Sequence, residues 1–323
     1  MLLQICSRAK DAITLSVREL LPLSWAKTST LNPVYRTLAL PLTGIQWVTY
    51  ADLPEGYELS AVRKDLDTLF PEGFLVRGCS KKTANSFGQE GCAILRTGAE
   101  AVLHLQNGHF EKKSLRKLLH QAEKKGRMVE MSLSDGNKSR LQKLQRQTKH
   151  GSKPQLAHVF RTYPFEKCRC FALLSLTDEL LAAVTLTMRD DSVAHTELML
   201  KRDNSPPGIM ELLLAGVFSK LREEGFCEWS LGEVPFYHLG EKRDAGFSVE
   251  EKVVALTAEL CRGAYDFRSL FYFKNKFGPE WRDVYLYSKR GISLLTLADL
   301  AIKTRYTELF AQGLLDTVMK PFS

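Results

Sequence analysis

The sequence has few of the local motifs that identify a chemistry directly. It contains no glycine-rich nucleotide-binding motif of the GxGxxG or GxxxxGKS/T type, no HExxH metal site and no GxSxG nucleophile. Its seven cysteines are scattered, and none forms the CxxC pair of a zinc knuckle. We expect a reducing, intracellular compartment and no metal site. Cys168 and Cys170 should share one face of a strand as small core residues.

Long hydrophobic runs are also missing. No window approaches the ~18 uncharged apolar residues of a membrane-spanning helix. The apolar start of the chain is broken by Arg8, Lys10 and Asp11, and it lacks a secretory signal region. Residues 1–20 are expected to form a helix that packs on the body or lies on a membrane surface. The sequence thus predicts a cytoplasmic protein with, at most, peripheral contact with the inner face of an anionic membrane.

The positive charge is concentrated in one segment. The 323 residues are 44% hydrophobic and 25% charged, which excludes overall disorder, and the formal net charge is +8. Residues 111–150 contain twelve Lys or Arg against four Asp or Glu, an excess equal to that of the whole chain. This concentration favours an anionic partner, with nucleic acid, phosphate ligands and membranes all open.

Residue periodicity predicts a mixed α/β chain. In the first part, short strands are expected at 43–50, 74–79, 91–98 and 101–106, with a helix over 58–70. A very basic amphipathic helix then covers 110–126. From 127 onward, we expect this order of strands and helices: a strand at 127–133, a helix at 137–148, an antiparallel meander at 168–177, 180–189 and 193–202, a helix at 208–225, a strand at 226–234, a helix at 264–278, a strand at 282–288 and a helical tail.

The order of elements after residue 127 is that of a GNAT-type acyltransferase domain. The predicted fold class is therefore α+β, with tandem GNAT-like domains whose mostly antiparallel sheets are flanked by helices. We predict four segments: an N-terminal helix with a shortened first GNAT-like half (1–110), a basic connecting helix (111–126), a catalytic second half (127–290) and a helical tail (291–323).

Three runs carry a resemblance to a known family: ELMLKRDNSPPGIMELLL, WSLGEVP and YDFRSLFYFKNKFGPEWRDVYL. They resemble the C-terminal catalytic domain of the phosphatidylglycerol lysyltransferases, also called lysylphosphatidylglycerol synthases. The resemblance covers about residues 85–290, and it includes a basic connecting helix with Leu115 and Arg116. It implies transfer of an aminoacyl group from an aminoacyl-tRNA to a phosphatidylglycerol-like lipid or another acceptor, with no cofactor and no stable protein partner.

The resemblance implies a catalytic site at Glu197, Glu233 and Lys274. The two carboxylates are expected on adjacent strands where the sheet splays, as base, as amine-recognition groups or as a structural ion pair. Lys274 is a candidate for a phosphate or oxyanion contact, or a solvated helix lysine. His195 and His238 flank this cleft and are expected to be structural.

Further candidates follow from the same resemblance. We expect a substrate-binding set at Gly208, Ile209, Met210, Glu211, Tyr265, Arg268, Lys276 and Arg282. We expect a tRNA-binding set on the basic helix at Lys112, Lys113, Arg116, Lys117, Lys124 and Lys125. The sequence departs from the family pattern at Leu200, where the family has arginine.

Two alternative functions remain open from the residues. The first is a CoA-dependent N-acyltransferase that would bind CoA at Gly208, at the start of a helix. It is weakened because this turn has only one glycine, preceded by Pro206 and Pro207. The second is a non-catalytic tRNA- or membrane-binding module of the same fold, which Leu200 favours.

Overall fold

The computed structural model describes residues 20–88, 92–162, 168–237 and 267–318 of the chain. The helix predicted over residues 1–20 falls almost wholly outside these ranges, and so do Tyr265 and His238. Among the described residues, none of the helices combines the length and the hydropathy needed to cross a bilayer.

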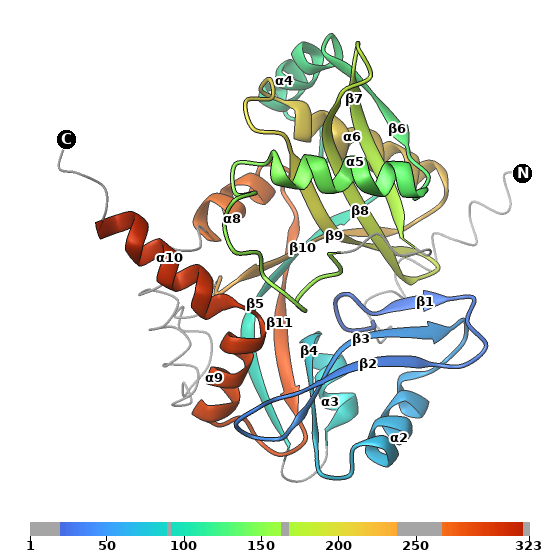
Figure 1. The fold of residues 1–323 in the computed structure, drawn as a ribbon. Helices are drawn as coiled ribbons and strands as arrows, with labels where there is room; N and C mark the ends of the chain where they lie inside the picture. The colour runs from blue at the N-terminus through green and yellow to red at the C-terminus, as the bar shows by residue number, and fades with distance from the viewer. Residues whose placement is uncertain (1–19, 89–91, 163–167, 238–266, 319–323) are drawn as a thin grey trace, which may run out of the picture.

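One continuous sheet forms the centre of the described structure (Figure 1). Its strands lie in the order β1-β3-β4-β11-β5-β10-β9-β8-β7-β6, and β2 pairs with β3. Most neighbours are antiparallel, which confirms the predicted α+β class, but β1 and β3, β3 and β4, and β9 and β10 are parallel. The strand bounds are β1 Ala26–Thr28, β2 Val34–Ala39, β3 Gln46–Pro54, β4 Phe74–Cys79, β5 Ala93–His104, β6 Gly126–Glu130, β7 Arg169–Ser175, β8 Leu180–Asp190, β9 Val193–Lys201, β10 Glu228–Pro235 and β11 Glu280–Ser288.

Helices pack against this sheet along its length. Their bounds are α2 Leu59–Leu69, α3 Lys81–Phe87, α4 Lys113–Glu123, α5 Asp135–Arg146, α6 Ile209–Glu223, α8 Phe267–Asn275, α9 Leu294–Lys303 and α10 Tyr306–Val318. α6 is buried along most of its length and forms the largest core with β7 to β10. α9 begins with a reciprocal capping box between Ser293 and Thr296, which satisfies donors that a helix start leaves free.

The predicted antiparallel meander is confirmed, but one prediction in the first half is wrong. β7, β8 and β9 pair in sequence as expected. The two strands predicted at 91–98 and 101–106 are a single strand, β5. Gly98 lies inside this strand. A Cβ at this position would come within 2.4 Å of the Val234 carbonyl oxygen, so β10 can lie this close only to a glycine. The glycine permits close approach of two strands and does not mark a turn.

The strand β11 joins the two predicted halves. It lies between β4 and β5, so a strand from the 127–290 segment pairs on both sides with strands from the 1–110 segment. The division into segments at residues 110, 126 and 290 stays a prediction. What the sheet order does establish is that these segments share one continuous set of backbone hydrogen bonds.

The parallel strands β9 and β10 separate soon after they begin. Their register runs only from Val193–His195 with Glu228–Ser230. Beyond this point β10 has a register shift against β5 between Ser230 and Glu233, and Gly232 has a φ of +84°. An irregularity of this kind turns a strand away from its neighbour. It creates the space in which the candidate site lies.

Candidate functional site

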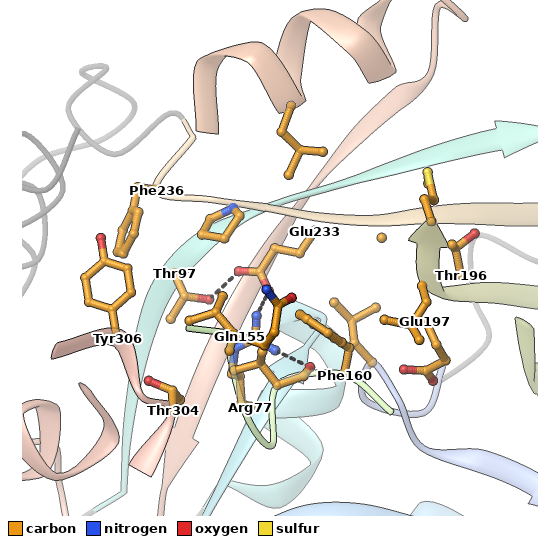
Figure 2. A pocket seen from close by; sticks show the side chains of 18 of the residues that line it. Arg77, Thr97, Gln155, Phe160, Thr196, Glu197, Glu233, Phe236, Thr304 and Tyr306 are labelled. Atoms are coloured by element: carbon orange, nitrogen blue, oxygen red, sulfur yellow. Dashed lines mark hydrogen bonds and ion pairs between the residues drawn. The ribbon is translucent and has the colours of Figure 1, made fainter. Parts of the chain in front are cut away.

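A cavity of about 860 Å³ occupies the space where β9 and β10 separate. Its walls come from the last residues of both strands, the segment 148–160, α8, α9 and α10. Most of the lining side chains are apolar. All three predicted catalytic residues, Glu197, Glu233 and Lys274, line this one cavity. Figure 2 shows Glu233 between Arg77 and Thr97, with Phe236 and Tyr306 to one side and Glu197 to the other.

Glu197 is held by hydrogen bonds from three parts of the chain. Its Oε2 accepts from the Ser24 hydroxyl at 2.8 Å and from the Arg161 backbone N–H at 2.7 Å, and its Oε1 accepts from the Thr187 hydroxyl at 2.8 Å. The residue is only 6% exposed. Burial raises the pKa of Glu197, and the three hydrogen bonds and the Arg161 charge oppose that rise.

Glu233 pairs with a cation from the first half of the chain. The Arg77 guanidinium donates to Oε2, and the Thr97 hydroxyl donates to Oε1 at 3.1 Å. Arg77 also donates to the Val159 carbonyl at 3.1 Å, so it ties the segment 148–160 to β4. This carboxylate is therefore oriented by two strands that precede it by more than 130 residues.

Lys274 is the buried cation of the site. It is 3% exposed, and its Nζ donates to the carbonyl oxygens of Gly232 and Glu233, each at 3.0 Å. Burial lowers its pKa from 10.5 to about 7, although the charges of Glu233 and Glu100 oppose this. A lysine with such a pKa exchanges a proton near neutral pH, which is a property of general bases.

His195 lines the cavity and is buried. Its Nδ1 lies 3.1 Å from the Ser230 hydroxyl, which also accepts from the Gly232 backbone N–H at 3.0 Å. Burial, reinforced by Arg189 and other nearby cations, lowers the pKa of His195 well below its usual value. The imidazole is thus neutral, and it supports the turn of β10 at Gly232.

The start of α6 lies elsewhere in the fold, so four predicted substrate-binding residues do not line the cavity. Ile209 and Met210 are buried in the core. Gly208 has a φ of +85°, and a Cβ there would lie 3.0 Å from both the side chain and the carbonyl oxygen of Leu118 in α4. Glu211 is buried and accepts from the Lys276 ammonium at 3.0 Å.

The other predicted substrate-binding residues that the structure describes do not line the cavity either. Arg282 makes two hydrogen bonds of 2.7 Å to Glu228 and one to Glu280, near the opposite end of β10. Lys276 joins α8 to α6 through Glu211, and Arg268 is exposed. Tyr265 is outside the described residues. The cavity therefore unites the predicted catalytic set, and none of the described members of the predicted substrate-binding set lines it.

The predicted tRNA-binding residues share one property, which is exposure to solvent. They lie on or beside α4, and all six are exposed: Lys112, Lys113, Arg116, Lys117, Lys124 and Lys125. α4 buries only Leu115 and Ala122. Its cationic side chains are therefore available to an anionic partner.

Sequence reasoning missed the residues that hold the two carboxylates. These residues belong to no sequence motif, and long-range packing brings each of them to the site. They are Ser24, Arg77, Thr97 and Arg161. It also missed the helical wall from α9 and α10. Leu200, which was singled out as a departure from the family pattern, does line the cavity and adds to its apolar surface.

A known family matches most of the chain. The model of the family "Phosphatidylglycerol lysyltransferase, C-terminal" matches residues 64–288. The phosphatidylglycerol lysyltransferase of Bacillus subtilis (strain 168) is 31% identical over 112 residues, which are 35% of this chain and 13% of that protein. The chain thus corresponds to a small part of this curated relative.

Solved structures show the same fold. The structure of L-PGS from Bacillus licheniformis matches 85% of this chain and 86% of its own with a TM-score of 0.65 and 18% identity. The C-terminal domain of a protein from Agrobacterium fabrum, named as a lysylphosphatidylglycerol synthetase, matches 85% of each chain with a TM-score of 0.62 and 18% identity.

Proposed function

Because this chain belongs to the phosphatidylglycerol lysyltransferase C-terminal family, we propose that it moves an aminoacyl group from an aminoacyl-tRNA to phosphatidylglycerol or a similar lipid acceptor. The observation that carries this proposal is the cavity between β9 and β10, which gathers Glu197, Glu233 and Lys274. It is large enough to hold the reacting groups, and hydrogen bonds fix the three candidate catalytic side chains in its wall.

The donor is already an activated ester, so the reaction requires mainly alignment and proton transfer. An acceptor hydroxyl oxygen forms a bond to the aminoacyl carbonyl carbon, and the bond from that carbon to the tRNA ribose oxygen breaks. The proton of the acceptor hydroxyl is lost to a base, and a proton is delivered to the departing ribose oxygen. No cofactor is needed to activate either substrate.

Lys274 is the proposed base. In its neutral form the amine has two N–H groups, and the carbonyl oxygens of Gly232 and Glu233 can accept both at 3.0 Å. The lone pair is then left for the acceptor proton. After it takes that proton, the ammonium has a third N–H that can stabilise the oxyanion or protonate the ribose oxygen.

Glu197 and Glu233 are proposed to recognise the amine of the donor. Both are oriented by neighbouring donors; Arg77 forms an ion pair with Glu233, and the Arg161 charge acts on Glu197. A cationic amino group entering the apolar cavity would gain from the negative charge of these carboxylates. The exposed cations of α4 are proposed to bind the tRNA phosphates, which predicts binding that weakens as salt increases. The site of action would then be the cytoplasmic face of the membrane, through peripheral contact.

The CoA-dependent alternative gains no support from α6. Leu118 lies against Gly208, where a pyrophosphate would have to approach the backbone. The other alternative, a non-catalytic tRNA- or membrane-binding module, is the function that a negative result of the transfer experiment would favour.

The experiment is transfer of label from a pool of radiolabelled aminoacyl-tRNAs to total lipid or to a soluble extract. The wild type, Lys274→Met and Lys64→Met are compared; Lys64 is an exposed lysine on α2, outside the cavity lining. We expect label in the lipid phase, a loss of about 10²–10⁴-fold in Lys274→Met and no change in Lys64→Met. The rate should rise with pH through about 7, because the neutral amine is the active form. Label that stays on tRNA with every acceptor would overturn the proposal and favour the non-catalytic module.

A further inference from the structure

One face of α9 exposes apolar side chains to solvent. Leu294 is 53% exposed, Leu295 58% and Ile302 47%, and Ala298 between them is also exposed. At about 100° per residue these four positions fall within an arc of about 100° of the helix surface. Exposed hydrophobic residues are unremarkable when they occur singly, but a contiguous set on one helix is typical of an interaction surface.

The loop between β2 and β3 extends this surface. Leu42 is 54% exposed, and its backbone N–H donates to the Asp299 carboxylate of α9 at 2.9 Å. Thr43 donates to the same carboxylate through its backbone N–H and its hydroxyl. The loop is therefore fixed beside the helix. We define the α9 face by its apolar residues, which are Leu42, Leu294, Leu295, Ala298 and Ile302.

The α9 face reaches the edge of the cavity. Leu294 and Ala298 are exposed to solvent and also line the cavity, while Leu297 and Ala301 continue its wall inward. The other side of the helix packs on the core that contains Leu95 of β5 and Leu286 of β11 (Figure 1). An apolar molecule on the α9 face would therefore have a continuous apolar path to the predicted catalytic residues.

The charges around this face favour an anionic surface. Residues 289–305 contain four Lys or Arg and a single acidic residue, Asp299. Lys289 and Arg305 form ion pairs with Asp67 and Glu308, so the positive charge of this face rests on Lys303 and Arg290. Asp299 is fully buried, so α9 exposes no carboxylate. Lys303 ends the helix, and Arg290 precedes it with a 3.9 Å ion pair to Glu72. Apolar side chains beside basic ones are the combination found in helices that lie on anionic lipid.

We propose that the α9 face docks on an anionic lipid bilayer, with Leu295 and Ile302 among the acyl chains and the cavity opening toward the lipid surface. The purpose of this docking rests on the proposed function, because it would bring a lipid acceptor to Lys274 without full extraction into water. A partner protein or a second copy of the chain is the competing occupant. The proposal differs from adhesion through α4, because it requires side chains to enter the apolar layer.

The test uses tryptophan as a depth probe. Leu295→Trp is mixed with vesicles of phosphatidylglycerol and phosphatidylcholine whose acyl chains carry bromine, which quenches nearby indoles. Three of the four native tryptophans, Trp25, Trp47 and Trp229, are almost fully buried, so their background is constant. The control is Leu176→Trp, in the β7–β8 turn, where the leucine is 82% exposed. We expect quenching of Leu295→Trp and none of Leu176→Trp.

A second pair of variants measures affinity. Leu295→Asp with Ile302→Asp should reduce vesicle association by about tenfold or more, because two apolar side chains that would be buried in the acyl layer are replaced by charged ones. Leu176→Asp should leave it unchanged. Vesicle association without quenching of Leu295→Trp would overturn the proposal. Concentration-dependent dimerisation of the wild type that Leu295→Asp with Ile302→Asp abolishes would also overturn it. Leu295 and Ile302 lie on an exposed face, and an unchanged unfolding transition of the double variant Leu295→Asp with Ile302→Asp verifies that the fold is intact.

Docking and catalysis can be separated by the lipid used. With short-chain phosphatidylglycerol dissolved as monomers, Leu295→Asp with Ile302→Asp should keep the wild-type rate of transfer, whereas with vesicles its rate should fall by about tenfold or more. Equal loss on both substrates would overturn the docking proposal. If the wild type transfers label neither to short-chain phosphatidylglycerol nor to vesicles, the proposed function is overturned, and the docking proposal is then judged by the quenching result.

Discussion

Lys274 should make the stability of the protein depend on pH. Its pKa is lowered by burial to about 7, whereas an unfolded chain has a lysine near 10.5. Between these values the unfolded state binds a proton that the native state has lost. Protonation of Lys274 in the unfolded state therefore lowers the free energy of unfolding, and this loss of stability becomes smaller as pH rises from 7 toward 10. Replacement of Lys274 by methionine removes this contribution.

The size of the effect follows from the two pKa values. Because each pKa unit corresponds to about 1.4 kcal/mol, the wild type should gain about 2 kcal/mol between pH 7 and pH 9 relative to Lys274→Met. The variant also leaves the carbonyl oxygens of Gly232 and Glu233 without their donor, which costs about 1–3 kcal/mol at every pH. This second cost lowers the free energy of unfolding of the variant by the same amount at every pH, so it does not change the pH dependence.

Urea unfolding at pH 7, 8 and 9, followed by tryptophan fluorescence, measures this difference. Lys64→Met serves as the control, because Lys64 is exposed and its substitution should leave the pH dependence unchanged. The reasoning is refuted if Lys274→Met and the wild type change in parallel between pH 7 and pH 9. Such a result would mean that Lys274 keeps its proton in the native state.

Three further substitutions test other parts of the structure. Arg189→Met should destabilise the protein by about 3–5 kcal/mol in urea unfolding, because it leaves the buried Glu100 carboxylate without its 2.8 Å ion-pair partner. Asp299→Ala should cost about 2 kcal/mol or more and speed amide hydrogen exchange at Leu42, whose N–H then has no acceptor. Gly232→Ala should cost about 1–3 kcal/mol and lower the rate of transfer, because alanine resists a φ of +84° and the turn supports the carbonyl that Lys274 binds.

The sequence predicts the second half of the fold well because its signals are local. The strands of the meander alternate or are continuously apolar, and α6 carries an apolar pattern that a glycine precedes. In the first half, β2 was not predicted, because it is an edge strand whose residues are exposed or only half buried. α3 was missed as well, since seven residues are too few to display a helical period.

The candidate site was predictable only in part. Glu197, Glu233 and Lys274 were selected by resemblance to a family motif, and the structure brings all three to one cavity. The roles assigned to them stay predictions. Tertiary partners have no such signal, since Arg77 and Glu233 are 156 residues apart and no local pattern links them. Periodicity likewise predicts that α9 is a helix without indicating which surface it covers.

The first half of the chain helps to hold the two carboxylates that the second half contributes to the cavity. Glu197 and Glu233 belong to β9 and β10, but Ser24, Arg77 and Thr97, which donate to them, all come from the first 110 residues. A buried carboxylate without such donors would take up a proton or draw in water, and it would lose its orientation. The first half therefore cannot be regarded as a spare copy of a GNAT-like domain. It supplies one donor to Glu197 and both donors to Glu233, while Arg161 and Thr187 complete the set at Glu197, so variation in Ser24, Arg77 or Thr97 should alter the orientation of these carboxylates.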